Sequence, residues 1–170
     1  MKKIVFVLAF LISVTVAGAQ EILHIKGVKN VNAGVGVNLD GYLINGGFEY
    51  YLGTKVFINS FFEYENTKRK YTENKLYGLS VDINYTVLSI MENMFFSLSL
   101  GSGGSYGMYK SRVEQQQENE FIYKLTCGAN YEFFVFNQVS FYLKYNQLIF
   151  TTSSLGPNNS ITVGAKFYFY

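Results

Sequence analysis

A period of two residues runs through most of the chain from residue 30 onward. Each periodic segment has apolar residues on one side and Gly, Ser, Asn or Thr on the other, and side chains of a β-strand point alternately to opposite faces. The third segment is the least regular, because Phe57 and Phe61 fall on its polar side. The eight segments cover residues 30–39, 42–52, 56–65, 77–87, 94–103, 121–133, 139–149 and 160–170. We therefore predict an all-β fold of eight antiparallel strands.

The connections between these segments support one common register. Asp40-Gly41 is a two-residue hairpin signal, and it would place Leu39 opposite Tyr42, both on the apolar side. A slip of one residue would turn each strand's apolar set to the other face. Apart from the first connection, Asp40-Gly41, short connections alternate with longer polar ones, as in barrels that have tight turns at one rim and long loops at the other. The longer ones are at 65–73, 108–120 and 151–160.

Alternation alone fits two kinds of barrel. A lipocalin-like barrel would turn the apolar side inward around a cavity and show the polar side to water. The polar side, however, carries few charges for a water-facing surface. In addition, Tyr and Phe recur near segment ends, as in the aromatic girdles of a membrane barrel. We therefore expect an eight-stranded antiparallel up-and-down transmembrane β-barrel in a bacterial outer membrane, with the apolar side toward lipid.

The N-terminal residues have the pattern of an export signal. Lys2 and Lys3 precede an apolar run from Ile4 to Val16, and Ala17-Gly18-Ala19 has the small-x-small form of a cleavage site. We expect a signal peptide at 1–19 and a barrel domain at 20–170. No later apolar stretch has the length that a membrane-spanning helix needs.

The last segment is expected to close the barrel by pairing with the first, because an open sheet edge is not tolerated in lipid. It also fits the pattern by which the barrel-assembly machinery recognises its substrates, polar-x-Gly-x-x-aromatic-x-aromatic. The matching residues are Thr162, Gly164, Phe167 and Phe169. The expected partners are therefore this machinery and the lipid of the outer membrane.

A barrel of eight strands leaves room inside for side chains but not for a wide channel. The charged residues of the polar side are candidates for ion pairs in this lumen: Glu49, Glu63, Asp82, Lys124, Glu132, Lys144 and Lys166. Buried charges are costly unless they are paired, so they should pair with one another or with trapped water. The alternative is that some lie near the rims and are solvated.

Little in the sequence indicates catalysis, a cofactor or a metal. The single histidine, His24, precedes the first segment, and the single cysteine, Cys127, falls on the lipid-facing side. One His and one Cys cannot form the usual metal cluster. The Gly-rich run at 101–107 lacks the Lys-Ser/Thr of a phosphate-binding loop. We expect no enzyme activity and no cofactor.

Charge is nearly balanced, with a formal net charge of +2, so no general affinity for nucleic acid is indicated. We expect no direct nucleic-acid binding. Lys68, Arg69 and Lys70 form a basic patch in an expected surface loop. This patch could contact lipid phosphates or a partner, or it could simply be solvated.

Four stretches resemble a known family: LSLGSGGSYGMY at 98–109, FIY at 121–123, LIFTTSSLG at 148–156 and VGAKFYF at 163–169. From about Phe61 to the last residue, the chain is similar to the conjugative-transposon protein TraO family of Bacteroidetes. The resemblance implies a structural component of a conjugal DNA-transfer apparatus in the outer membrane, with other conjugation proteins as partners. It brings no catalytic residues. Two other functions remain open, a surface or adhesion barrel with ligand-binding loops and a small-solute pore.

Overall fold

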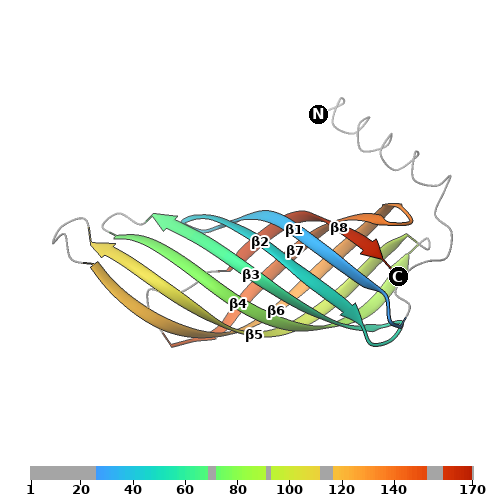
Figure 1. Cartoon of the computed structure of the whole chain (residues 1–170), viewed down its shortest axis with the longest axis horizontal. Coiled ribbons are helices and arrows are strands. Elements are labelled where there is room, and N and C mark those ends of the chain that lie inside the picture. Colours follow the sequence, from blue (N-terminus) through green and yellow to red (C-terminus); the bar gives the residue numbers. More distant parts are fainter. Residues whose placement is uncertain (1–25, 69–71, 91–92, 112–116, 153–158, 170) are drawn as a thin grey trace, which may run out of the picture.

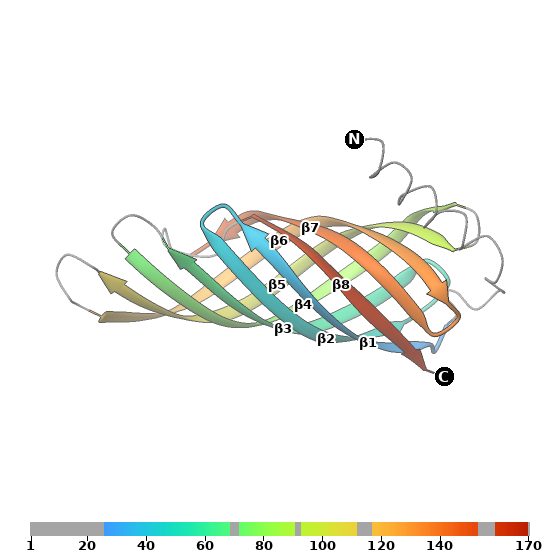
Figure 2. The same cartoon turned by 90° about the horizontal axis from the view of Figure 1, so that it is seen from above.

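The chain forms a closed barrel of eight antiparallel strands in which every strand pairs with its sequence neighbours. The computed structural model describes residues 26–68, 72–90, 93–111, 117–152 and 159–169. The strands are β1 (Lys29–Asn38), β2 (Gly41–Tyr51), β3 (Val56–Lys68), β4 (Thr72–Ile90), β5 (Met94–Ser111), β6 (Gln117–Phe136), β7 (Val139–Thr151) and β8 (Ser160–Phe169). Figure 1 and Figure 2 show them wound as a tilted cylinder. The expected signal peptide at 1–19 lies outside the described residues.

Closure is made by β1 and β8, which pair along their full lengths from Lys29 opposite Phe169 to Asn38 opposite Ser160. The sheet therefore has no open edge along its common length, as lipid requires of any β-structure that spans it. In the part of the chain that the structure describes, no helix is long and apolar enough to cross a membrane.

The two faces of the sheet have the predicted polarity. Most buried side chains are polar or charged, and the outer surface carries a dense layer of Val, Leu, Ile, Phe and Tyr. Phe57 and Phe61 do point into the lumen, as their positions in the pattern indicated. Phe57 stacks on Tyr51, and the Lys144 ammonium lies 4.5 Å from the centre of the Phe61 ring. The predicted fold class is confirmed.

The outer surface has the composition of a lipid-facing band. Aromatic side chains border it at both ends. Tyr42, Tyr64, Tyr77, Tyr106 and Phe121 lie toward the end that carries the β1–β2 hairpin, and Phe48, Tyr50, Tyr85, Phe167 and Phe169 lie toward the end of the chain termini. On β4 the stretch from Tyr77 to Tyr85 rises about 20 Å along the barrel axis, at ~3.3 Å per residue and a tilt of about 40°. Among the described residues, the outward positions between these borders carry no charged side chain. Ser60, Ser102 and Gln147 are the polar residues found there.

Two details of the predicted connections are wrong. The first hairpin turns at Leu39-Asp40, one residue earlier than predicted, and pairs Asn38 with Gly41. The apolar side chains still point outward, because Val37 instead of Leu39 lies opposite Tyr42, and Val37 and Tyr42 are both on the outer face.

The long polar connections are also shorter than predicted. Residues 65–68, 72–73, 108–111 and 117–120 belong to strands. In ENTK at 65–68 and QENE at 117–120 both faces of the strand carry polar side chains, so the apolar alternation that marks a half-buried strand is absent there.

Glycines at the closing seam make room for a lumenal tyrosine. Gly34 of β1 and Gly164 of β8 lie opposite each other, and a Cβ on either would collide with Tyr142 of β7. The Tyr142 hydroxyl passes over them and donates a hydrogen bond to Asn45 Oδ1 at 3.1 Å. Tyr142 thereby ties β7 to β2 across the seam.

The lipid-facing band can be tested with Val81, which lies midway between Tyr77 and Tyr85. Val81→Lys should lower the free energy of unfolding by about 2–4 kcal/mol, because it places an ammonium at mid-membrane depth. The control is Leu39→Lys in the first turn, which should change the free energy of unfolding by less than about 0.5 kcal/mol. Both are measured by urea unfolding from phospholipid vesicles, followed by far-UV circular dichroism. Equal, small effects would contradict a lipid-facing position for Val81.

Candidate functional site

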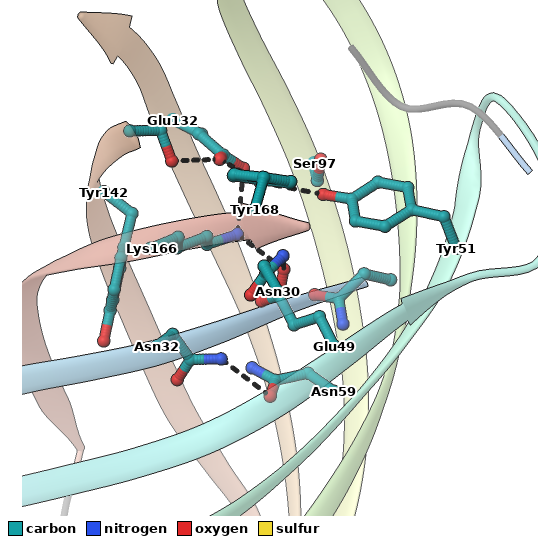
Figure 3. A network of polar contacts seen from close by, with 12 residues as sticks. Asn30, Asn32, Glu49, Tyr51, Asn59, Ser97, Glu132, Tyr142, Lys166 and Tyr168 are labelled. Atoms are coloured by element: carbon teal, nitrogen blue, oxygen red, sulfur yellow. Dashed lines mark hydrogen bonds and ion pairs between the residues drawn. The ribbon is translucent and has the colours of Figure 1, made fainter. Parts of the chain in front are cut away.

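Inside the lumen, one lysine lies between two carboxylates. Lys166 extends from β8, and its Nζ lies 2.9 Å from Glu49 Oε2 of β2 and 2.8 Å from Glu132 Oε2 of β6. All three side chains are at least 98 % buried. Figure 3 shows them converging from three walls of the barrel. A buried charge of this kind is tolerated only when it is paired and hydrogen-bonded.

Further hydrogen bonds reach both carboxylates. Asn30 Nδ2 donates to Glu49 Oε2 at 2.7 Å. The hydroxyls of Ser140 and Tyr168 both donate to Glu132 Oε1. Charge-assisted bonds of this type are stronger than neutral ones. The cluster therefore links β1, β2, β6, β7 and β8 through side chains alone.

Two further ion pairs cross the lumen. Lys144 of β7 pairs with Asp82 of β4, and Lys124 of β6 pairs with Glu63 of β3. In each pair the two strands are separated by two others, so the contact spans the interior rather than running along one wall. All seven residues proposed from the sequence lie in the lumen, and these four contacts bring them together.

Sequence reasoning did not include Glu65 among these charges, although it placed Glu65 on the polar side of its strand. Glu65 is 3 % exposed and accepts a hydrogen bond of 2.6 Å from Asn38 Nδ2. Glu65 was missed because it lies in the outer part of β3, at the start of a stretch expected to be a loop. It follows Glu63 by two residues and therefore lies on the same lumenal face, and this spacing could have identified it.

Apolar side chains form a buried cluster toward each end of the lumen. Near the chain termini, Val28, Tyr51, Phe57, Phe95, Phe134 and Tyr168 form one cluster. Within it the ring centres of Phe134 and Tyr168 are 4.9 Å apart. Toward the opposite end, Leu76, Tyr109 and Ile122 form a second cluster. A polar cavity of about 20 Å³ between Glu63, Ser80, Lys124 and Asn146 has room for about one water molecule.

On the side of the second cluster, β4, β5 and β6 continue past the β1–β2 hairpin. This sheet extension consists of residues 72–76 of β4, 107–111 of β5 and 117–122 of β6, and the β5–β6 end lies farthest to the left in Figure 1. Charged side chains gather on it. Lys75, Lys110, Glu118 and Glu120 are exposed, and Glu73 is partly exposed. The extension thus exposes charged side chains, while Leu76, Tyr109 and Ile122 are buried on it.

The remaining predicted residues are distributed as follows. Lys68 is exposed at the end of β3, opposite Glu73, while Arg69, Lys70 and His24 lie outside the described residues. Thr162 is buried in the lumen, Gly164 lies at the seam, and Phe167 and Phe169 are on the outer face of β8. Their role as an insertion signal stays a prediction.

Cys127 lies on the outer face of β6, between Leu100 and Gln147, as expected from its parity. No group of three or more His, Cys, Asp or Glu residues that could hold a metal ion occurs within the described ranges.

No protein-family model and no curated protein matches the sequence. Several solved structures match the fold. The N-terminal β-barrel domain of Pseudomonas aeruginosa OprF has a TM-score of 0.63 at 14 % identity, with 85 % of this chain and 98 % of that chain covered. Ail, the attachment invasion locus protein of Yersinia pestis, has a TM-score of 0.58 at 14 % identity, with 85 % and 100 % covered.

A designed barrel is also similar. The solution structure of the de novo designed TMB2.3 has a TM-score of 0.54 at 13 % identity, with 89 % of this chain and 99 % of that chain covered. The chain therefore has the fold of the eight-stranded outer-membrane β-barrels. At these identities the likeness concerns the fold alone.

The cluster of Lys166, Glu49 and Glu132 can be tested by removing its cation. Lys166→Met should lower the free energy of unfolding by about 3–5 kcal/mol, because two carboxylates remain buried without a counter-charge. Lys75→Met, on the exposed extension, is the control and should change stability by less than about 0.5 kcal/mol. Adding Glu49→Gln and Glu132→Gln to Lys166→Met should restore part of the loss. Urea unfolding from vesicles measures each variant, and equal stability of the two single variants would contradict the cluster's role.

Proposed function

We propose that the protein is a non-conducting outer-membrane barrel that displays its sheet extension to a macromolecular partner at the cell surface. The observation that carries the proposal is the contrast between the two parts of the molecule. The lumen is filled by ion pairs and other buried side chains, whereas the extension exposes charges and apolar side chains to solvent. The proposed role is non-enzymatic.

The filled lumen argues against a solute pore. Its ion pairs cross the interior at several levels, and the polar cavity between them has room for about one water molecule. Opening a path for solute would separate buried charges from their partners, at a cost of several kcal/mol for each ion.

The direction of the extension supports surface display. It lies at the end opposite to the start of β1 and the end of β8, and the figures show it on the side away from the C-terminus. In outer-membrane barrels the turns on the periplasmic side are short and the longer connections face the exterior. Among the neighbours, the Yersinia pestis protein is described as an attachment invasion locus protein and the neisserial protein NspA as a surface protein.

Conductance tests the sealed lumen. The full-length mature protein, inserted into a planar lipid bilayer, should give no steady current steps, because buried side chains fill the lumen. A wide porin inserted in the same bilayer is the positive control. Reproducible current steps from the protein itself would favour the small-solute pore and contradict the proposal.

A role in conjugal DNA transfer is a second candidate, and the observation that favours it is the sequence resemblance to the TraO family. The stretches that carry it lie mainly on β5, β7 and β8, with FIY (121–123) on β6. In this role the displayed surface would contact other proteins of the transfer apparatus.

Deleting the gene tests this second candidate. Conjugation frequency should fall in the deletion strain and return when the gene is supplied on a plasmid. An unchanged frequency would remove the transfer role while leaving surface display intact.

A further inference from the structure

One edge of the sheet extension has no neighbouring strand. β6 pairs with β5 from Gln117 to Phe133, but it pairs with β7 only from Lys124 onward. Within the described part of the chain, no strand therefore lies against residues 117–122 on the β7 side. The β5–β6 end projects beyond the β1–β2 hairpin in both Figure 1 and Figure 2.

The backbone groups on this edge can be identified from Tyr123. Its N–H donates to Thr152 Oγ1 at 3.0 Å, and its carbonyl accepts from the Thr152 N–H at 3.1 Å. Tyr123 thus directs both groups toward β7. Because this direction alternates along an antiparallel strand, Gln117, Asn119 and Phe121 direct theirs to the same side. Glu118 and Glu120 direct theirs to β5.

Two glutamates are the only usual protecting feature that this edge carries. Natural proteins blunt an exposed strand edge with charged side chains, especially Lys, with Pro or with a bulge. The stretch QENEFI at 117–122 has neither Lys nor Pro, and its pairing with β5 has no bulge. Phe121 is 70 % exposed on the outer face, and Glu118 and Glu120 are exposed on the other face. The edge therefore offers main-chain donors and acceptors between an apolar and an acidic side.

We propose that residues 117–122 of β6 bind an extended polypeptide segment of a partner by β-strand addition. Main-chain hydrogen bonds give affinity in this mode, and alternate side chains give specificity. The partner segment carries Lys or Arg opposite Glu118 and Glu120, and apolar residues beside Phe121, since opposite charges across strands attract. This inference rests on the proposed surface display and names the chemistry of its partner.

A peptide binding experiment tests the proposal on the full-length mature protein in phospholipid nanodiscs. The probe is a fluorescent eight-residue peptide of alternating lysine and valine, and its affinity is measured by fluorescence polarisation. An analogue N-methylated throughout keeps the charge and length but lacks the N–H donors. It should bind at least about tenfold more weakly, since each lost main-chain hydrogen bond costs a factor of a few.

Variants of the edge complete the test. Asn119→Pro removes an N–H that faces the edge and leaves the hydrogen bonds to β5 in place, so the barrel should fold while peptide affinity falls at least about tenfold. Asn119→Thr keeps the N–H and should bind normally. Glu118→Gln with Glu120→Gln should weaken binding and reduce its dependence on salt. Circular dichroism of each variant verifies folding.

The outcomes separate this inference from the function on which it rests. Absent binding, or binding that N-methylation and Asn119→Pro leave unchanged, would overturn strand addition. Neither result would alter the conductance of the barrel, so surface display would stand. Current steps in the bilayer, by contrast, would remove the sealed-barrel function whatever the peptide does.

Discussion

This structure depends on one constraint: the hydrocarbon of a membrane cannot form hydrogen bonds, so every peptide N–H and C=O group within it must be paired inside the protein. Within hydrocarbon each unpaired peptide group costs several kcal/mol, so a sheet that crosses the membrane must close on itself. The full-length pairing of β1 with β8 meets this demand. The closed sheet encloses a lumen. Its apolar side chains point outward into lipid, and its polar side chains point inward into the lumen. The inverted distribution of residues follows from the closed sheet.

An interior of this kind must also be electrically satisfied. The lumen encloses Glu49, Glu63, Glu65, Asp82 and Glu132 with three lysines, and all of these side chains are buried. Ion pairs neutralise four of the carboxylates and connect walls across the lumen, and Glu65 accepts a hydrogen bond from Asn38. The burial of these charged groups strengthens the electrostatic contacts between them. Packing and charge therefore support the same rigid, filled cylinder.

The alternation of side chains was enough to predict the number of strands, the facing of nearly every residue and the identity of the lumenal charges. It worked because lipid and lumen differ sharply in polarity along residues 77–87 and similar stretches. The pattern did not identify strands where that difference in polarity ends. The outer parts of β3, β4, β5 and β6 were therefore predicted to be loops, and Glu65 was overlooked. The pairing of Lys144 with Asp82 was equally beyond reach, because contacts across a lumen depend on strand tilt and stagger.

The position of Lys166 has a consequence for the order of assembly. The lysine comes from β8, while its two carboxylates come from β2 and β6. A partly assembled sheet that lacks β8 therefore holds two acidic groups with no cation between them. Such intermediates are penalised as soon as water leaves the nascent interior. The last hairpin thus supplies both the edge that completes the wall and the charge that neutralises its centre, which makes premature desolvation of an incomplete barrel unfavourable.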